Sequence, residues 1–245
     1  MNKIVAVIPA RYGSSRFPGK PLALICGKPM IQWVYECVKS VNEIDEVFVA
    51  TDDKRIWKTV NAFGGYAIMT GECTCGTDRV YEASKDFDAD IVLNIQGDEP
   101  LIKSEMIRDL IHTFDDPSVV MATLKKEMLS EDVNDPNIVK VITNINGDAV
   151  YFSRSAIPYN RAGREAVKYY KHIGIYGYTK EFLSKFVALP QSELELTEKL
   201  EQLRTLEHGF KIRVAETKYQ SIAVDLPEHI RLIEDEIRRN EKSGV

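Results

Sequence analysis

Residues 4–20 read IVAVIPARYGSSRFPGK, and this stretch decides the fold. Its first five residues are apolar and mostly β-branched, which predicts a buried strand. The loop that follows holds two glycines and three cations, Arg11, Arg16 and Lys20, and no acidic residue. Glycines allow backbone amides to approach an anion closely, and the cations can bind phosphate oxygens. A strand that runs into such a loop predicts an α/β sheet with an anion site at the end of its first strand.

The alternation of strand and helix continues through the first half of the chain. Strands are expected at 4–8, 47–50, 66–69 and 91–95, and segments of helical period lie at 30–38, 54–62, 78–84 and 106–114. This alternation predicts a mostly parallel, doubly wound, Rossmann-like sheet. Continuous apolar runs such as residues 91–95 suit strands that are covered by helices on both faces.

The pattern changes after Asp116-Pro117. Strand-like runs at 119–124, 138–143, 149–152 and 173–178 follow one another, and Asn146-Gly147-Asp148 favours a tight turn, which predicts a smaller antiparallel lobe. A polar, mobile loop is expected at 159–165, followed by two helices between 194 and 208 with Gly209 as a stop. Residues 225–228, Asp-Leu-Pro-Glu, are expected to start a last helix that ends near Arg239. We expect one domain with segments at 1–116, 117–225 and 226–245.

The composition narrows the class of protein. Hydrophobic residues make up 44% of the chain and charged residues 28%, and no apolar run approaches the ~20 residues of a membrane span. The apolar N-terminus is broken by Pro9 and lacks a signal-peptide cleavage site, so the cytoplasm is the expected location. The net charge of −5 argues against a nucleic-acid binder. Four irregularly spaced cysteines and four scattered histidines predict neither a disulfide framework nor a zinc site.

The loop after the first strand differs from two common phosphate-binding loops. A Walker A loop has four residues between its glycine and Gly-Lys, and Ser or Thr follows. Here five residues separate Gly13 from Gly19-Lys20, and Pro21 follows. No G-x-G-x-x-G succeeds the strand, so a Rossmann dinucleotide site is also disfavoured. The alternative is a solvated basic loop, but its position, its glycines and its lack of acids favour an anion site.

Asp98 is a candidate for holding a metal ion. It follows the apolar run 91–95 and is therefore expected at the carboxyl end of a central strand, where open α/β sheets bind ligands. Mg²⁺ prefers one or two carboxylates together with phosphate oxygens and water, so one aspartate facing the basic loop suffices. The alternative is an aspartate that stabilises a turn before Pro100. Asp88-Ala89-Asp90 has the D-x-D pattern but precedes its strand, which indicates a surface turn.

At the basic loop the chain resembles a known family, the 3-deoxy-manno-octulosonate (Kdo) cytidylyltransferases, also called CMP-Kdo synthetases. Residues 8–22 are similar to the nucleotide signature of that family nearly residue for residue. The resemblance covers almost the whole chain and continues through residues 27–31, 49–53, 76–79, 94–100, 151–154, 172–176 and 200–204. The first signature alone would indicate only a sugar nucleotidyltransferase, and the later blocks narrow it to this family.

The resemblance implies an enzyme that transfers CMP from CTP to a Kdo-type sugar acid and releases pyrophosphate, for bacterial lipopolysaccharide or capsule synthesis. It implies Mg²⁺ as the cofactor, with Asp98 and Asp225 as its ligands, although Asp225 could equally be only the N-cap of the last helix. It further implies a homodimer in which residues 1–116 form the nucleotide-binding half and residues 117–225 the acceptor-binding and dimerisation lobe.

The candidate site residues fall into three groups. The catalytic candidates are Arg11, Lys20, Asp98 and Asp225. The nucleotide-binding candidates are Pro9, Ala10, Arg11, Gly13, Ser14, Ser15, Arg16, Lys20, Gly76, Thr77, Asp78, Arg79 and Gln96. The resemblance suggests acceptor contacts from Arg154, His172, Tyr176, Glu201 and Gln202. Without it, His172 would be interpreted as a buried hydrogen-bonding residue and Glu201-Gln202 as a solvated helix face.

The chain departs from the usual family pattern at three places. Cys75 replaces a Ser before Gly76, Tyr159-Asn160 stands for Trp-Asp, and Leu226 rather than Thr follows Asp225. These changes leave open the geometry of a second metal and the acceptor, for which an amino-Kdo, another ulosonic acid or a phosphonate are alternatives. The choice of cytosine over uracil is open as well. The non-enzyme alternative is a silent binding protein of the same fold, against which the complete set of loop cations and carboxylates argues.

Overall fold

The computed structural model describes residues 2–14, 16–163 and 167–243. Residue contacts divide the chain into two compact units, 1–107 together with 220–245, and 108–219. Ser15, a candidate nucleotide-binding residue, and Arg164 and Glu165 of the expected polar loop lie outside the described residues. No helix in the described part of the chain combines the length and the apolar character that crossing a membrane requires.

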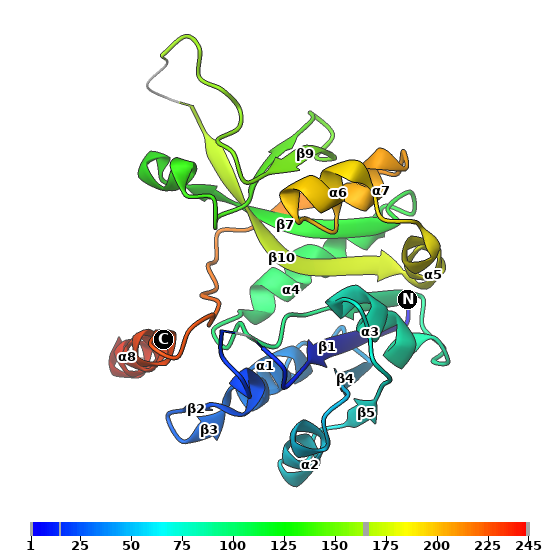
Figure 1. The fold of residues 1–245 in the computed structure, drawn as a ribbon, viewed down its shortest axis with the longest axis vertical. Helices are drawn as coiled ribbons and strands as arrows, with labels where there is room; N and C mark the ends of the chain where they lie inside the picture. Colours follow the sequence, from blue (N-terminus) through cyan, green and yellow to red (C-terminus); the bar gives the residue numbers. More distant parts are fainter. Residues whose placement is uncertain (1, 15, 164–166, 244–245) are drawn as a thin grey trace. The chain divides into compact units, whose positions relative to one another are not determined.

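The first unit is built on a parallel sheet. Its strands are β1 (Ile4–Ala10), β4 (Glu46–Thr51), β5 (Ala67–Met69) and β6 (Ile91–Asn94), in the order β6-β1-β4-β5 with parallel neighbours throughout. Helices α1 (Met30–Lys39), α2 (Lys54–Ala62) and α3 (Gly76–Ser84) connect successive strands, and Figure 1 shows β1, in dark blue, beside β4. The predicted parallel, doubly wound arrangement is confirmed.

The strand order reverses at β1. From β1 the chain proceeds through β4 to β5 and then returns to β6 on the other side of β1. All residues of β1 except Pro9 are buried, as are all four of β6, because both strands are paired within the sheet and covered by helices. The carboxyl ends of β1 and β6 therefore flank the switch point at which sheets of this kind bind ligands.

The C-terminal segment packs against the basic end of the chain. It carries α8 (His229–Ser243), whose Ile233 and Ile237 share a core cluster with Val224, Ile25 and Met30. Near this cluster lie η1 (Lys20–Leu22) and the short hairpin of β2 (Leu24–Ile25) and β3 (Lys28–Pro29). These contacts fix residues 220–228 in the first unit.

The last helix begins later than the sequence predicted. The carbonyls of Leu226 and Pro227 accept hydrogen bonds from the amides of His229 and Ile230, so residues 226–228 form a turn of i to i+3 bonds before the helix. Asp225 is therefore not an N-cap, since it lies four residues before the first helical residue. Its backbone amide instead donates to Nδ1 of His229 at 3.1 Å.

The second unit is mainly antiparallel, as predicted. β10 (Tyr169–Thr179) pairs antiparallel with β7 (Met121–Met128) and β8 (Lys140–Thr143), and β8 pairs antiparallel with β9 (Ala149–Ser153). β11 (Arg213–Glu216), which was not expected, pairs parallel with β7. The turn before β9 contains Gly147 with a φ of 80°, a conformation that favours glycine.

The helices of the second unit are short. α4 (Ser104–Ile111) crosses the division between the units and continues into η2 (His112–Asp115), and η3 (Ser130–Asn134) follows β7. After β10 come α5 (Lys180–Ala188), α6 (Glu193–Glu198) and α7 (Leu203–Glu207). The expected pair of helices between residues 194 and 208 is present, and Gly209 with a φ of 78° follows them, whereas α5 was not expected.

Candidate active site

The loop after β1 folds back on its own backbone. The carbonyl of Tyr12 accepts hydrogen bonds from the amides of Ser14 and Gly19, both at 2.9 Å. Gly19 has a φ of 73°, and a Cβ atom there would lie 2.9 Å from Cε2 of Tyr12. This position therefore requires glycine for two reasons, its backbone conformation and the ring beside it. The turn sets Lys20 at the start of η1, close to the end of β1.

Gly97 brings the end of β6 close to the end of β1. A Cβ atom at Gly97 would lie 3.1 Å from Cδ1 of Ile31 and 3.2 Å from the carbonyl oxygen of Pro9. The next residue is Asp98, whose carbonyl accepts a hydrogen bond of 2.9 Å from the amide of Val224. Three segments distant in the sequence therefore meet here, and they carry Lys20, Asp98 and Asp225.

The side chains at this junction form one network of charges. Nζ of Lys20 lies 2.5 Å from Oδ2 of Asp98 and 3.7 Å from Oδ1 of Asp225. Nη2 of Arg16 lies 2.9 Å from the same oxygen of Asp225. The Lys20 side chain is 13% exposed and that of Arg16 is 63% exposed, so the network extends from a nearly buried ammonium to an open guanidinium. Arg11 is exposed directly after β1.

The two carboxylates fit the donor set of a magnesium ion. Both Asp98 and Asp225 approach the single ammonium of Lys20, so they lie on the same side of the loop. The described residues contain no group of three His, Cys, Asp or Glu side chains arranged to hold a metal. Two carboxylates without further protein ligands are what Mg²⁺ prefers when phosphate oxygens and water complete its shell.

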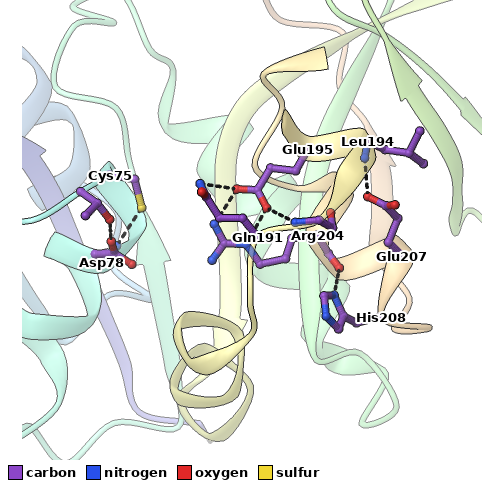
Figure 2. Close-up of polar contacts among 10 residues, drawn as sticks. Cys75, Asp78, Gln191, Leu194, Glu195, Arg204, Glu207 and His208 are labelled. Carbon is purple, nitrogen blue, oxygen red and sulfur yellow. Dashed lines mark hydrogen bonds and ion pairs between the residues drawn. The ribbon is translucent and has the colours of Figure 1, made fainter. Parts of the chain in front are cut away.

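The next group of candidates surrounds the start of α3. Sγ of Cys75 accepts a hydrogen bond from the amide of Asp78 at 3.4 Å, and the Asp78 carboxylate accepts one from Thr74 (Figure 2). Cys75 thus caps the helix in place of the usual Ser. Gly76 lies next to β1, since a Cβ atom there would be 3.9 Å from Cγ of Pro9. Thr77 is buried.

Arg79 and Gln96 are held by neighbouring polar groups. The Arg79 guanidinium is buried and lies 2.6 Å from Oδ2 of Asp52 and 2.5 Å from Oγ1 of Thr70. Nε2 of Gln96 donates to Oδ1 of Asn94 at 3.4 Å. Arg79 therefore braces the start of α3 against the end of β4, and its charge is balanced by Asp52.

All five acceptor candidates belong to the second unit. Nε of Arg154 donates to the carbonyl of Glu198 at 2.8 Å, and its Nη1 donates to the carbonyl of Pro136 at 3.0 Å. The carboxylate of Glu198 in turn accepts from the Arg154 amide and from Oγ of Ser153. Glu198 thus fixes both the backbone and the side chain of Arg154.

His172 and Tyr176 form an aromatic contact on β10. Their ring centroids lie 5.5 Å apart, and the Phe152 ring meets the His172 ring edge-on at 5.0 Å. Burial lowers the pKa of His172 to about 3, so the imidazole is neutral at physiological pH. Burial, with a smaller contribution from the negative charge of Glu201, raises the pKa of Tyr176, so the phenol is neutral as well. Near neutral pH both side chains are therefore uncharged hydrogen-bonding groups.

A buried ion pair supports the last two candidates, Glu201 and Gln202. Arg204 donates to the carboxylate of Glu195 through Nε at 2.8 Å and Nη2 at 2.5 Å, as Figure 2 shows. The amide of Leu200 donates to the carbonyl of Glu195, which closes the turn between α6 and α7. Nε2 of Gln202 is buried and has no hydrogen-bond partner among the described residues. An unsatisfied buried amide is costly, which favours a polar ligand at this position.

Several residues that support the site were missed by the sequence reasoning. They are Thr123, which contacts His172, together with Glu198, Glu195 and Lys140. The buried Lys140 ammonium donates to the carbonyls of Asp135, Ile138 and Arg154. The sequence signals for these residues are weak, because the residues next to a polar residue in an expected strand or helix do not show which distant groups it will contact. Two further supporting residues, Asp52 and Arg204, did stand in quoted motifs, residues 49–53 and 200–204.

The sequence is similar to those of known cytidylyltransferases. The family model described as cytidylyltransferase matches residues 5–212. The 3-deoxy-manno-octulosonate cytidylyltransferase of Thermodesulfovibrio yellowstonii is 51% identical, over 94% of this chain and 96% of that protein. The protein of the same name from Syntrophus aciditrophicus is 49% identical, over 96% of this chain and 97% of that protein.

Comparison with solved structures indicates the same family. CMP:2-keto-3-deoxy-manno-octonic acid synthetase complexed with CTP superposes with a TM-score of 0.94 at 45% identity, over 97% of this chain and 99% of that chain. The 4-diphosphocytidyl-2C-methyl-D-erythritol synthase of Anaerococcus prevotii, with a TM-score of 0.66 and 17% identity, shares the fold. The chain is thus a cytidylyltransferase, and within that class it belongs to the 3-deoxy-manno-octulosonate cytidylyltransferase family.

Proposed function

We infer that this protein transfers CMP from CTP to 3-deoxy-manno-octulosonate and releases pyrophosphate. The observation that carries the inference is the network of Arg16, Lys20, Asp98 and Asp225 at the carboxyl ends of β1 and β6. Relatives that are 49–51% identical over nearly their whole length are named for this activity. A role in bacterial lipopolysaccharide or capsule synthesis follows from the same acceptor.

The proposed reaction is an in-line displacement at the α-phosphorus of CTP. A hydroxyl of the sugar acid attacks the α-phosphorus and its proton is released to solvent. The bond between the α-phosphorus and the oxygen that bridges it to the β-phosphorus breaks, and pyrophosphate leaves with the electron pair. Such a transfer depends on positioning and on charge neutralisation rather than on a covalent intermediate. Lys20 is the central cation, since its ammonium is held within 4 Å of both carboxylates.

The nucleotide contacts are assigned by position. Arg11, Arg16 and Lys20 bind the triphosphate, and the backbone of Pro9, Ala10, Gly13 and Ser14 lines it. Gly76, Thr77, Asp78, Arg79 and Gln96 face the nucleoside, for which their place at the start of α3 and after β6 is suitable. The Asp52 contact holds Arg79 in place, so that Arg79 orders α3.

Asp98 and Asp225 would hold Mg²⁺ in the reactive complex. The ion supplies neutralisation of the charge on the transferring and leaving phosphates. Lys20 contacts both carboxylates, so it is positioned to exchange its Asp98 contact for a phosphate oxygen. Both carboxylates are accessible enough for such an exchange, with side chains 31% and 42% exposed.

The acceptor is assigned to the second unit. Arg154 supplies a guanidinium for the sugar carboxylate, and His172, Tyr176, Glu201 and Gln202 supply neutral and acidic groups for its hydroxyls. The unsatisfied amide of Gln202 and the neutral His172–Tyr176 pair support this assignment.

A homodimer and a cytoplasmic location stay predictions, and sedimentation of the purified protein would test the first.

A pyrophosphate-release assay tests the function. The four nucleoside triphosphates are crossed with Kdo, an amino-Kdo, another ulosonic acid and a phosphonate, each with Mg²⁺ and with EDTA. We expect turnover with CTP and Kdo only when Mg²⁺ is present. Turnover with UTP in preference to CTP, or with another acid in preference to Kdo, would move the assignment to that pair, and no turnover with any pair would refute the enzyme.

A further inference from the structure

The antiparallel pairing of β10 with β7 is interrupted beside the acceptor cluster. The register runs from Tyr169 opposite Met128 to Ile173 opposite Leu124 and resumes with Tyr176 opposite Thr123. Gly174 and Ile175 are skipped, which defines a β-bulge on β10. A bulge leaves backbone groups outside the ladder, and those groups need other partners when they are buried.

Thr123 fills this bulge with its hydroxyl. Oγ1 of Thr123 lies 2.8 Å from the carbonyl oxygen of Ile175 and 3.0 Å from that of Ile173. The same oxygen lies 2.9 Å from Nε2 of His172. Thr123 is fully buried, so these groups must satisfy one another without bulk solvent.

The proton count of this contact selects one tautomer of His172. A hydroxyl has one proton, and carbonyl oxygens can only accept. If that proton pointed to Nε2, Oγ1 would turn lone pairs toward the carbonyl oxygens of Ile173 and Ile175 at 3.0 and 2.8 Å, so the proton goes to one of these carbonyls instead. Oγ1 then presents a lone pair to Nε2, and Nε2 must carry the ring proton. Because burial lowers the pKa of His172 to about 3, the ring holds only this one proton near neutral pH. Nδ1 is therefore an unprotonated hydrogen-bond acceptor.

Nδ1 is the atom of His172 that is left for a ligand. No described residue makes a hydrogen bond to it, and the His172 side chain is only partly buried. The rings of Phe152 and Tyr176 both contact the imidazole and, together with the Thr123 hydrogen bond, restrict its orientation.

We propose that Thr123 is a positioning residue for acceptor recognition: it fixes His172 as the Nε2–H tautomer, so that Nδ1 accepts a hydrogen bond from a hydroxyl of the sugar acid. The proposal rests on the proposed acceptor role of His172 and adds a residue to it. It explains why a threonine lies among the otherwise apolar buried residues at the start of β7, 121–124. Valine has the same shape but could not accept the Nε2 proton.

The tautomer can be measured directly by the ¹⁵N shifts and two-bond ¹H–¹⁵N couplings of the His172 ring. We expect the Nε2–H pattern in the wild-type protein and in Thr123→Ser, which keeps the hydroxyl. Thr123→Val should lose that pattern, because Nε2–H would face a methyl group. Thr113→Val is the matched control, since it removes another buried hydroxyl that donates to a carbonyl, that of Leu110.

Steady-state kinetics test the consequence for recognition. Thr123→Val should raise the KM for Kdo about tenfold, the usual value of one hydrogen bond, and leave the KM for CTP unchanged. Thr123→Ser should stay within about twofold of wild type, and Thr113→Val should leave both KM values unchanged.

The outcomes separate this inference from the proposed function. An Nδ1–H pattern in the wild-type protein would overturn the inference, even if Thr123→Val fails to fold. A Thr123→Val protein in which the tautomer changes but the KM for Kdo does not would also overturn the inference. The same holds if Thr113→Val changes the tautomer and the KM for Kdo as much as Thr123→Val does. Absence of pyrophosphate release from CTP and Kdo by the wild-type protein would refute the proposed function, while the tautomer measurement would still stand.

Discussion

In the first unit, Lys20, Asp98 and Asp225 form a network of full charges that is open at Arg16. In the second unit, His172, Tyr176 and Thr123 form a cluster of neutral groups tied together by hydrogen bonds and ring contacts. The first network is suited to a polyphosphate, whose charge must be neutralised. The second is suited to hydroxyl groups, for which the direction of each donor and acceptor matters more than charge.

The difference teaches how the two halves of a transfer reaction make different demands on a protein. Charges act over several ångströms and tolerate exposure, so segments after β1, after β6 and before α8 suffice to assemble them. Hydrogen-bond recognition requires a fixed atom, so the second cluster lies on the paired strands β7 and β10, where Thr123 and the Phe152 ring contact His172. The following substitutions test this contrast.

The largest effect is expected from Arg204→Met, which would leave the Glu195 carboxylate buried without its partner. Burial raises the pKa of Glu195, but hydrogen bonds from Arg204 outweigh it and hold the pKa below its ordinary value. Breaking such a pair costs about 3–5 kcal/mol of unfolding free energy. Urea unfolding measures this loss. Arg238→Met, in an exposed ion pair on α8, is the control and should change stability by less than about 0.5 kcal/mol.

The next effect is on turnover. Asp98→Asn removes charge where the transition state needs it and should lower kcat by about 10²–10³-fold with unchanged unfolding free energy. Asp88→Asn is the matched control, because its fully exposed side chain contacts only Lys3, at 3.9 Å, among the described residues. Near-normal turnover by a folded Asp98→Asn protein would remove this residue from the mechanism.

A smaller effect is expected on nucleotide affinity. Lys20→Ala should raise the KM for CTP by about 10–100-fold, because it removes a charge-assisted bond to the triphosphate, and should leave the KM for Kdo unchanged. Lys85→Ala, at the exposed C-cap of α3, controls for the loss of a lysine. An unchanged KM for CTP would contradict the assignment of the basic loop.

The smallest effect concerns pH and the neutral state of His172. Its pKa falls from 6.5 to about 3 on folding, so between these values the unfolded chain binds a proton that the folded protein does not. The unfolding free energy should therefore fall as pH falls below 6.5, by at most about 1.4 kcal/mol per pH unit from this group. Above 6.5 this contribution is fully present and does not vary.

Unfolding of His172→Gln at several pH values isolates that contribution. Between pH 4 and 6, the unfolding free energy of the variant should depend less steeply on pH than that of the wild-type protein. The difference between the two slopes should be on the order of 1 kcal/mol per pH unit. His112→Gln, with a side chain 61% exposed, should keep the wild-type slope. Identical slopes for His172→Gln and wild type would show that His172 is not held neutral.

The sequence predicted the first unit well because its signals are local. An apolar run that ends in a loop with Arg11, Arg16 and Lys20 is visible without knowing what lies opposite. The helix capped by Asp53 likewise begins where its own residues dictate. The start of α8 was misplaced because Pro227 favours a first helical turn, whereas here it lies in the turn before it. The strand β11 is only four residues long, and its pairing with β7 gives no local signal.

The contacts in the second unit could not be predicted from the sequence pattern. His172 could be selected only by resemblance, and Thr123 could not be selected at all, because their contact depends on a register shift between two strands about 50 residues apart. The carbonyl oxygens of Glu198 and Pro136, which accept hydrogen bonds from the Arg154 side chain, could not be predicted for the same reason. Partners that meet through tertiary structure leave no periodic mark in the chain.

The central claim is that the cation after β1 and the carboxylate after β6 act on one magnesium-bound triphosphate. Calorimetric titration of CTP, with and without Mg²⁺, tests it in the wild-type, Lys20→Ala and Asp98→Asn proteins. We predict that Lys20→Ala weakens CTP binding in both conditions, whereas Asp98→Asn abolishes the gain in affinity that Mg²⁺ gives the wild-type protein. Wild-type affinities and an unchanged Mg²⁺ dependence in both variants would contradict the account.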